Sequence, residues 1–169
     1  MTNALFGKRT GLSLVELIMT LSILSILAAL ILPSAQMMAK RTKEIELRRS
    51  LRVLRNAIDD YKKTYDKAAT DGVNGVKMIT SVNKSGYPES FEKLIEGDTF
   101  GGVYPDKKKF LRRVPCDPMN DEKGIACEKS WGVRAYTDKE CSDRLGDDLF
   151  DVCSMNEGTA IDGTKYKDW

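Results

Sequence analysis

The stretch from Leu17 to Leu32 reads LIMTLSILSILAALIL and contains no charged residue. It lies within residues 12–39, where 20 of 28 residues are apolar and Glu16 is the one charged residue. A helix needs about 20 such residues to cross the hydrocarbon core of a bilayer. This stretch therefore predicts a membrane-spanning helix, and the remaining residues are interpreted outward from it.

A secretory signal peptide is the first alternative, because Lys8 and Arg9 precede the apolar stretch. The stretch is longer than the usual apolar core of a signal peptide. No small-x-small cleavage site follows it, since Ala35 and Ala39 are poorly spaced. We therefore expect a lasting anchor. Basic residues also follow the stretch at 40–43, so the flanking charges do not settle its orientation.

Composition excludes several classes of function. The 169 residues include 27 Lys and Arg, 25 Asp and Glu, and no histidine, which gives a net charge of +2. This near-neutral charge disfavours nucleic acid as a partner. The absence of histidine excludes Ser-His-Asp and Cys-His catalysis, His-ligated zinc, and haem bound through a C-x-x-C-H motif. We expect the chain not to be an enzyme.

All four cysteines lie in the C-terminal third of the chain, and none forms a C-x-x-C pair: Cys116, Cys127, Cys141 and Cys153. This spacing favours disulfides formed in an oxidising compartment over a Cys₄ zinc site, with four reduced buried thiols as a further alternative. Four cysteines allow three pairings. Short loops favour Cys116–Cys127 together with Cys141–Cys153. Disulfides place the C-terminal part outside the cytoplasm.

An amphipathic pattern continues beyond the apolar stretch, and no Gly or Pro interrupts residues 34–71. The pattern predicts that the membrane helix runs on through residues 40–70 as a stalk, with a bend at Pro33. A coiled-coil dimer seam is an alternative interpretation of the stripe. The stripe consists of Leu47, Leu51, Leu54, Ile58, Tyr61 and Tyr65.

Charge is unevenly distributed along the chain. Residues 40–67 hold ten basic and five acidic residues, whereas residues 68–169 carry a net charge of −4. A basic stalk and an acidic head could attract each other between neighbouring subunits, although exposed ion pairs are individually weak. A solvated helix face is the alternative. Nucleic-acid binding by the arginines is disfavoured because few aromatic residues lie nearby; these are Arg48, Arg49, Arg52 and Arg55.

Residues 71–169 are expected to form a small head. Residues 87–96 predict a short helix. Two β-like runs, 131–136 and 149–154, predict a small antiparallel sheet, with a third strand near the C-terminus. The predicted fold class is α+β, in which a long N-terminal transmembrane and stalk helix packs on a small C-terminal antiparallel sheet.

Residues 8–17 read KRTGLSLVEL and resemble the type IV prepilin signal, in which a basic leader is followed by Gly, an apolar residue, Ser or Thr, two apolar residues and Glu. Leu12 stands where Phe is commonest in that family. The resemblance implies that prepilin peptidase removes the leader, residues 1–11, by cutting between Gly11 and Leu12, and methylates the Leu12 amine. It also implies that Glu16 neutralises the Leu12 amine of a neighbouring subunit and thereby sets the register of a helical filament.

The same resemblance assigns roles to the segments. It implies that residues 12–39 form the transmembrane and filament-core helix, with Pro33 at the family's usual depth. Residues 40–70 then form the periplasmic stalk helix and residues 71–169 the globular head. The implied location is the inner membrane, crossed once, with the N-terminus cytoplasmic and the C-terminal domain periplasmic.

The head resembles the major pseudopilin of type II secretion systems in four places. Residues 86–88 read GYP and precede a predicted short helix that contains leucine, residues 114–118 read VPCDP, a predicted strand carries Trp131 and Tyr136, and residues 167–169 read KDW. The chain departs from that family at residues 117–120, where Asp-Pro-Trp-Gly is replaced by Asp-Pro-Met-Asn. The overall type IV pilin-like fold is therefore expected to carry a modified head.

The acidic calcium loop of that family is thinned in this chain. Ser154, Asp162 and Asp168 are the only matches to it. Calcium takes six or more oxygen ligands, and these positions supply few carboxylates. We expect no cofactor, with these three residues as weak calcium candidates, and the disulfides stabilise the head in place of the metal.

The resemblance implies a structural subunit, a pseudopilin, of a periplasmic filament that drives type II protein secretion. The implied partners are further copies of the chain, prepilin peptidase, an inner-membrane assembly platform and minor pseudopilins. One alternative is a type IV pilin of a surface pilus. Another is a membrane-anchored monomeric periplasmic binding domain that keeps Met1 and does not self-associate.

Overall fold

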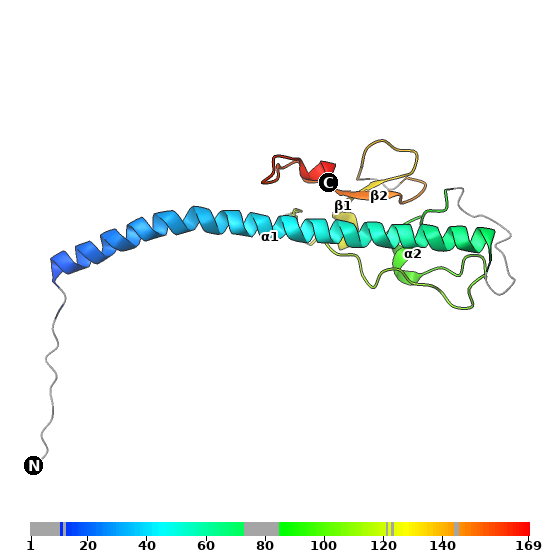
Figure 1. The fold of residues 1–169 in the computed structure, drawn as a ribbon, viewed down its shortest axis with the longest axis horizontal. Helices are drawn as coiled ribbons and strands as arrows, with labels where there is room; N and C mark the ends of the chain where they lie inside the picture. Colours follow the sequence, from blue (N-terminus) through cyan, green and yellow to red (C-terminus); the bar gives the residue numbers. More distant parts are fainter. Residues whose placement is uncertain (1–10, 12, 73–84, 121, 123, 144–145) are drawn as a thin grey trace, which may run out of the picture. The chain divides into compact units, whose positions relative to one another are not determined.

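The computed structural model describes residues 11, 13–72, 85–120, 122, 124–143 and 146–169 (Figure 1). It has an α+β layout, with one long N-terminal helix and a small antiparallel sheet. The chain divides into two compact units, Met1–Lys40 and Arg41–Trp169. The elements in order are α1 (Leu14–Thr70), α2 (Phe91–Glu96), η1 (Cys127–Lys129), β1 (Trp131–Arg134), β2 (Asp151–Ser154) and η2 (Tyr166–Asp168).

Helix α1 continues through Pro33 and through both segments that were predicted to be helical. Its apolar stripe lies in the unit Arg41–Trp169, where the side chains of Leu47, Leu54 and Ile58 are buried among residues of the head. Burial of such a face is the main source of stability for a helix in water. Because the head of the same chain covers the stripe, the coiled-coil interpretation is wrong.

Helix α2 is shorter than the predicted helix, because it begins at Phe91 rather than at residue 87. The backbone before it is extended at Ser90, and the carbonyl of Pro88 accepts the amide of Leu149 at 2.8 Å instead of a helical partner. Gly97 ends the helix with φ of 84°. A Cβ atom there would lie 2.6 Å from the Lys108 carbonyl oxygen, so this turn requires glycine.

The sheet has two strands, β1 and β2, which pair antiparallel with Trp131 opposite Ser154 and Arg134 opposite Asp151. Both strands are shorter than predicted because neighbouring amides bond elsewhere. The Tyr136 amide, for example, donates to the Asp148 carboxylate at 2.8 Å. The predicted third strand is wrong for the described residues near the C-terminus, which form a single bridge, Thr159 to Lys165, and the short helix η2.

The structure pairs the four cysteines into two short-range disulfides, Cys116–Cys127 and Cys141–Cys153. The first joins the segment before β1 to helix η1. The second joins the β1–β2 connection to strand β2. Both therefore hold loops of the head, whose buried centre includes Trp131, Leu149 and Val152.

Candidate functional site

The apolar part of α1, within the unit Met1–Lys40, exposes its large side chains instead of packing them. Leu14, Val15 and Ile26 are each more than 60% exposed. From Leu14 to Lys40 the helix extends about 40 Å at 1.5 Å per residue, more than the ~30 Å of a bilayer core. By length and composition, α1 is the one helix among the described residues that could cross a membrane.

The polar side chains between Leu14 and Ile31 fall into two groups. Three hydroxyls are satisfied within the helix, since Thr20, Ser22 and Ser25 donate to backbone carbonyls three or four residues earlier at 2.8–2.9 Å. Glu16 is different, because no described residue forms a hydrogen bond or ion pair with its carboxylate. A carboxylate in an apolar stretch is costly without a partner. Glu16 is therefore the side chain on this surface that a cation from another molecule would stabilise most.

The structure describes two of the three other residues that were predicted to act near the N-terminus of α1. Gly11 is exposed, and nothing lies within 4 Å of a Cβ built on it. Leu12 lies outside the described residues, so its predicted contact with Glu16 stays a prediction. Pro33 lies inside α1, and the predicted bend also stays a prediction.

In the unit Arg41–Trp169, residues 158–169 are tied to α1 by a set of contacts that we name the C-terminal clasp. Its helical members are Glu44, Arg48 and Arg55, which lie on one face because they are spaced by four and seven residues. The carboxylate of Glu44 is buried. It accepts the Ile161 amide at 2.9 Å and the Tyr166 hydroxyl at 2.8 Å.

Arg48 and Arg55 complete the clasp. Arg48 pairs with Asp162 at 2.8 Å, and its guanidinium lies 4.0 Å from the centre of the Trp169 ring. Arg55 donates to the Asp151 carboxylate at 2.8 Å and to the backbone oxygen of Trp169 at 2.6 Å. The basic stalk therefore attracts acidic residues of its own head, and these two arginines are not a free basic face.

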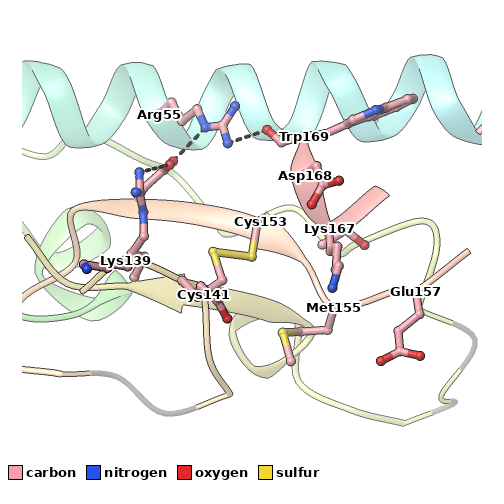
Figure 2. Close-up of a pocket in the computed structure, with 13 residues that line it drawn as sticks. Arg55, Lys139, Cys141, Cys153, Met155, Glu157, Lys167, Asp168 and Trp169 are labelled. Carbon is pink, nitrogen blue, oxygen red and sulfur yellow. Dashed lines mark hydrogen bonds and ion pairs between the residues drawn. A yellow bond between two sulfur atoms is a disulfide. The ribbon is translucent and has the colours of Figure 1, made fainter. Parts of the chain in front are cut away.

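A hollow of about 570 Å³ lies beside the clasp, between α1, the sheet and the last residues (Figure 2). One wall carries Asp151, whose two carboxylate oxygens each accept a guanidinium at 2.8 Å, one from Arg55 and one from Arg134. The Cys141–Cys153 disulfide forms another wall. Arg55 of α1 and Arg134 of β1 share the one carboxylate of Asp151, so the arrangement ties α1 to the sheet.

The three calcium candidates each have a different environment. Ser154 is fully buried and donates to the Asp117 carboxylate at 2.6 Å, while Asp162 pairs with Arg48. Asp168 lies in η2 and lines the hollow of Figure 2. Within the described part of the chain, no group of three or more Cys, Asp or Glu side chains could hold a metal ion. Calcium binding by these three residues therefore stays a weak prediction.

Asp117 lies next to the buried Ser154, and its carboxylate is hydrogen-bonded within the head. Its carboxylate accepts the Ser154 hydroxyl and, at 2.8 Å, the Met119 amide. Burial raises the pKa of the Asp117 carboxyl, and the two hydrogen bonds oppose that rise. Each carboxylate oxygen of Asp117 therefore has a donor from the protein.

Sequence reasoning did not identify the clasp. Glu44 and Arg48 flank the apolar stripe at helical spacing, which is a weak signal that they face the head. Their partners are more than 110 residues away in the sequence. No local pattern links residues at such a separation, so the pairing appears only in the structure.

The clasp predicts a pH dependence of stability. Burial, together with the hydrogen bond to Glu44 and its charge, raises the pKa of Tyr166 from 10.0 to about 12. Between these values the unfolded chain has lost the phenolic proton and the folded chain has kept it. The free energy of unfolding is therefore expected to fall as the pH rises through this window, and the contribution is fully present below about pH 10.

Urea unfolding at several alkaline pH values measures this effect. The variant Tyr166→Phe has no proton to lose and is expected to show a shallower fall than the wild type. The exposed Tyr136 offers a matched control, Tyr136→Phe, because it removes a hydroxyl from the same protein. Equal slopes in the wild type and in Tyr166→Phe would contradict the prediction.

Comparison of the chain with known protein families, with curated proteins and with solved structures found no match.

Proposed function

We propose that this chain is a structural subunit, a pseudopilin, of a periplasmic filament that drives type II protein secretion. The observation that carries the proposal is the exposed apolar surface of α1 with Glu16 as its one charged side chain between Leu14 and Ile31. A helix of this kind is stable in a lipid bilayer or packed against other apolar helices. Assembly into a helical filament provides the second environment.

The motif around Glu16 supports a specific route to that filament. Residues 8–17 resemble the prepilin signal, so prepilin peptidase would cut after Gly11 and leave a methylated amine on Leu12. That amine is the cation that Glu16 of a neighbouring subunit would bind. Ion pairs in an apolar environment specify register well, because a shifted subunit leaves both charges unpaired.

The head supports the pseudopilin form of the proposal. The stripe of α1 is buried by a small α+β head that two disulfides hold. Disulfides persist in oxidising compartments, which agrees with a periplasmic head on a single-pass inner-membrane helix. In this proposal the chain works through assembly and is not an enzyme, and prepilin peptidase, the assembly platform and the minor pseudopilins are its partners.

Deletion of the chain in its native cells tests the proposal. We expect proteins to be lost from the culture medium, no change in surface pili, and recovery of export when the wild-type chain is supplied. Loss of surface filaments with unchanged export would favour the alternative, a type IV pilin. A chain that shows no self-association in membranes would instead favour the anchored monomeric binding domain.

A further inference from the structure

The unit Arg41–Trp169 has a second hollow, lined by lysines, beside the C-terminal part of α1. The clasp lies further toward the N-terminus of the same helix. The volume of the second hollow is about 520 Å³, and it lies between α1 and the loop that precedes Leu111. We name it the lysine pocket. The charged residues that line it are Lys63, Lys67, Lys108, Lys109 and Asp60, so cations outnumber acids by four to one.

The lysine pocket is held in place by contacts to buried groups. The Lys108 ammonium donates to the hydroxyl of the buried Thr64 at 3.0 Å. It also lies 5.6–5.7 Å from the ring centres of Tyr104 and Phe110. These contacts fix one cation between two aromatic rings and leave donor capacity on the ammonium for an external acceptor.

The other cations of the lysine pocket are poorly neutralised. Lys63 reaches Asp60 at 3.4 Å on the exposed surface. Lys67 and Lys109 are exposed, and neither forms an ion pair with a described residue. The lysine pocket therefore presents a net positive charge to solvent, and a carboxylate-rich surface is the partner that fits it.

The chain itself contains such a surface. We name the described residues 137–143 and 146–148, between β1 and β2, the acidic loop; they hold five carboxylates and one cation, Lys139. Asp138, Glu140, Asp143 and Asp147 are exposed, and none forms an ion pair with a described residue. The fifth, Asp148, is buried and accepts the Tyr136 amide.

The two charged surfaces lie on different sides of α1 in one head. Figure 1 places the loop of the lysine pocket on the side of α1 where α2 lies, and the connection between β1 and β2 on the other side. Complementary patches on different sides of one molecule produce head-to-tail contacts between copies. Such contacts extend into an open chain when the rotation does not close a ring.

We propose that the lysine pocket binds the acidic loop of a second copy of this chain. The inference rests on the proposed filament and deepens it, because it names a contact between the globular heads of neighbouring copies that is independent of the apolar helix. Each exposed pair is weak, so the contact acts through several pairs together and is sensitive to salt.

Zero-length cross-linking of the full-length chain tests the inference. Chains purified in detergent from ¹⁴N-grown and ¹⁵N-grown cells are mixed, reconstituted together into vesicles and treated with a carbodiimide, which couples lysine amines to touching carboxylates. We expect mixed-isotope peptides that join Lys67 or Lys109 to carboxylates of the acidic loop, with a yield that falls as salt is raised.

Charge-reversal variants provide the second part of the test. The double variant Lys67→Glu/Lys109→Glu removes two of the coupling amines, so its effect is measured on the links from the remaining pocket amines, Lys63 and Lys108; these links are expected to fall by about tenfold or more, which corresponds to about 1.4 kcal/mol. Mixing it with Asp138→Lys/Asp143→Lys chains is expected to restore cross-linking between the heads of different copies. The matched control Arg49→Glu/Lys129→Glu makes the same charge change at exposed cations outside the pocket and the clasp, and it is expected to leave the links unchanged.

A long amine-reactive cross-linker, applied to the same vesicles, separates failure of the inference from failure of the proposed filament. If oligomers form but no mixed-isotope links join the lysine pocket to the acidic loop, the inference is wrong and the proposed filament is not contradicted. Links found only within one copy overturn it in the same way. Absence of oligomers overturns both.

Discussion

Replacing Glu16 with glutamine is expected to reduce filament assembly by about a hundredfold or more while the chain stays in the membrane. In the proposed filament the Glu16 carboxylate faces the Leu12 amine of a neighbour in an apolar environment. Removing one partner of a buried ion pair costs about 3–5 kcal/mol, because the other charge is left uncompensated. Each 1.4 kcal/mol corresponds to a factor of ten in an equilibrium constant.

Electron microscopy of sheared or membrane-extracted filaments, with immunoblotting of the membrane fraction, measures this effect. The matched control is Ser22→Ala, because the Ser22 hydroxyl already bonds to the Ile18 carbonyl of its own helix and is not needed by a neighbour. Glu16→Asp keeps the charge on a shorter side chain and is expected to lie between glutamine and the wild type. Wild-type filament yield in Glu16→Gln would refute the assigned role of this residue.

Leu54→Ala is expected to destabilise the head by about 2–5 kcal/mol. The Leu54 side chain is fully buried within the cluster that joins α1 to the head. Truncation removes its apolar contacts and leaves a cavity that the surrounding residues fill only in part. For a unit of this size the melting temperature is expected to fall by about 10 °C.

Val53, which is adjacent to Leu54, provides the control for this substitution. Val53 is 43% exposed, and Val53→Ala is expected to change the free energy of unfolding by about 0.5 kcal/mol or less. Thermal unfolding of the full-length chain in detergent, followed by the fluorescence of Trp131 and Trp169, compares the two variants. Similar small effects at both positions would show that the head does not bury this face of α1.

The long helix and its packing face could be predicted from the sequence because both are local, periodic patterns. The spacing of Leu47, Leu51 and Leu54 identifies the buried side of α1, and the structure confirms that these side chains are buried. Four cysteines at short separations likewise favour the pairing that the structure has. Each of these signals lies within a dozen or so residues of the chain.

The parts that sequence reasoning missed depend on distant contacts. The residues before Phe91 look helical, but their backbone groups bond to the segment before β2 instead. The C-terminal residues look like a strand, but Glu44, Arg48 and Arg55 hold them against α1 as a turn and a short helix. Tertiary contacts override local preference in both places.

Of the residues proposed to act in assembly, one could be predicted from the sequence and the others could not. Glu16 stands out in the sequence because it is a lone carboxylate in an apolar stretch, and its position in α1 agrees with that interpretation. The lysine pocket does not stand out, since Lys63 and Lys67 are separated by some forty residues from Lys108 and Lys109. Only folding of the loop onto α1 brings these four cations together.

The intact mass and N-terminal peptide of the chain, purified from its native membrane, test the central claim most directly. The proposed function predicts a mature chain that begins at Leu12, carries one methyl group on its amine and lacks residues 1–11. A chain that keeps Met1 in cells with an active prepilin peptidase would contradict the filament proposal and favour a membrane-anchored monomer.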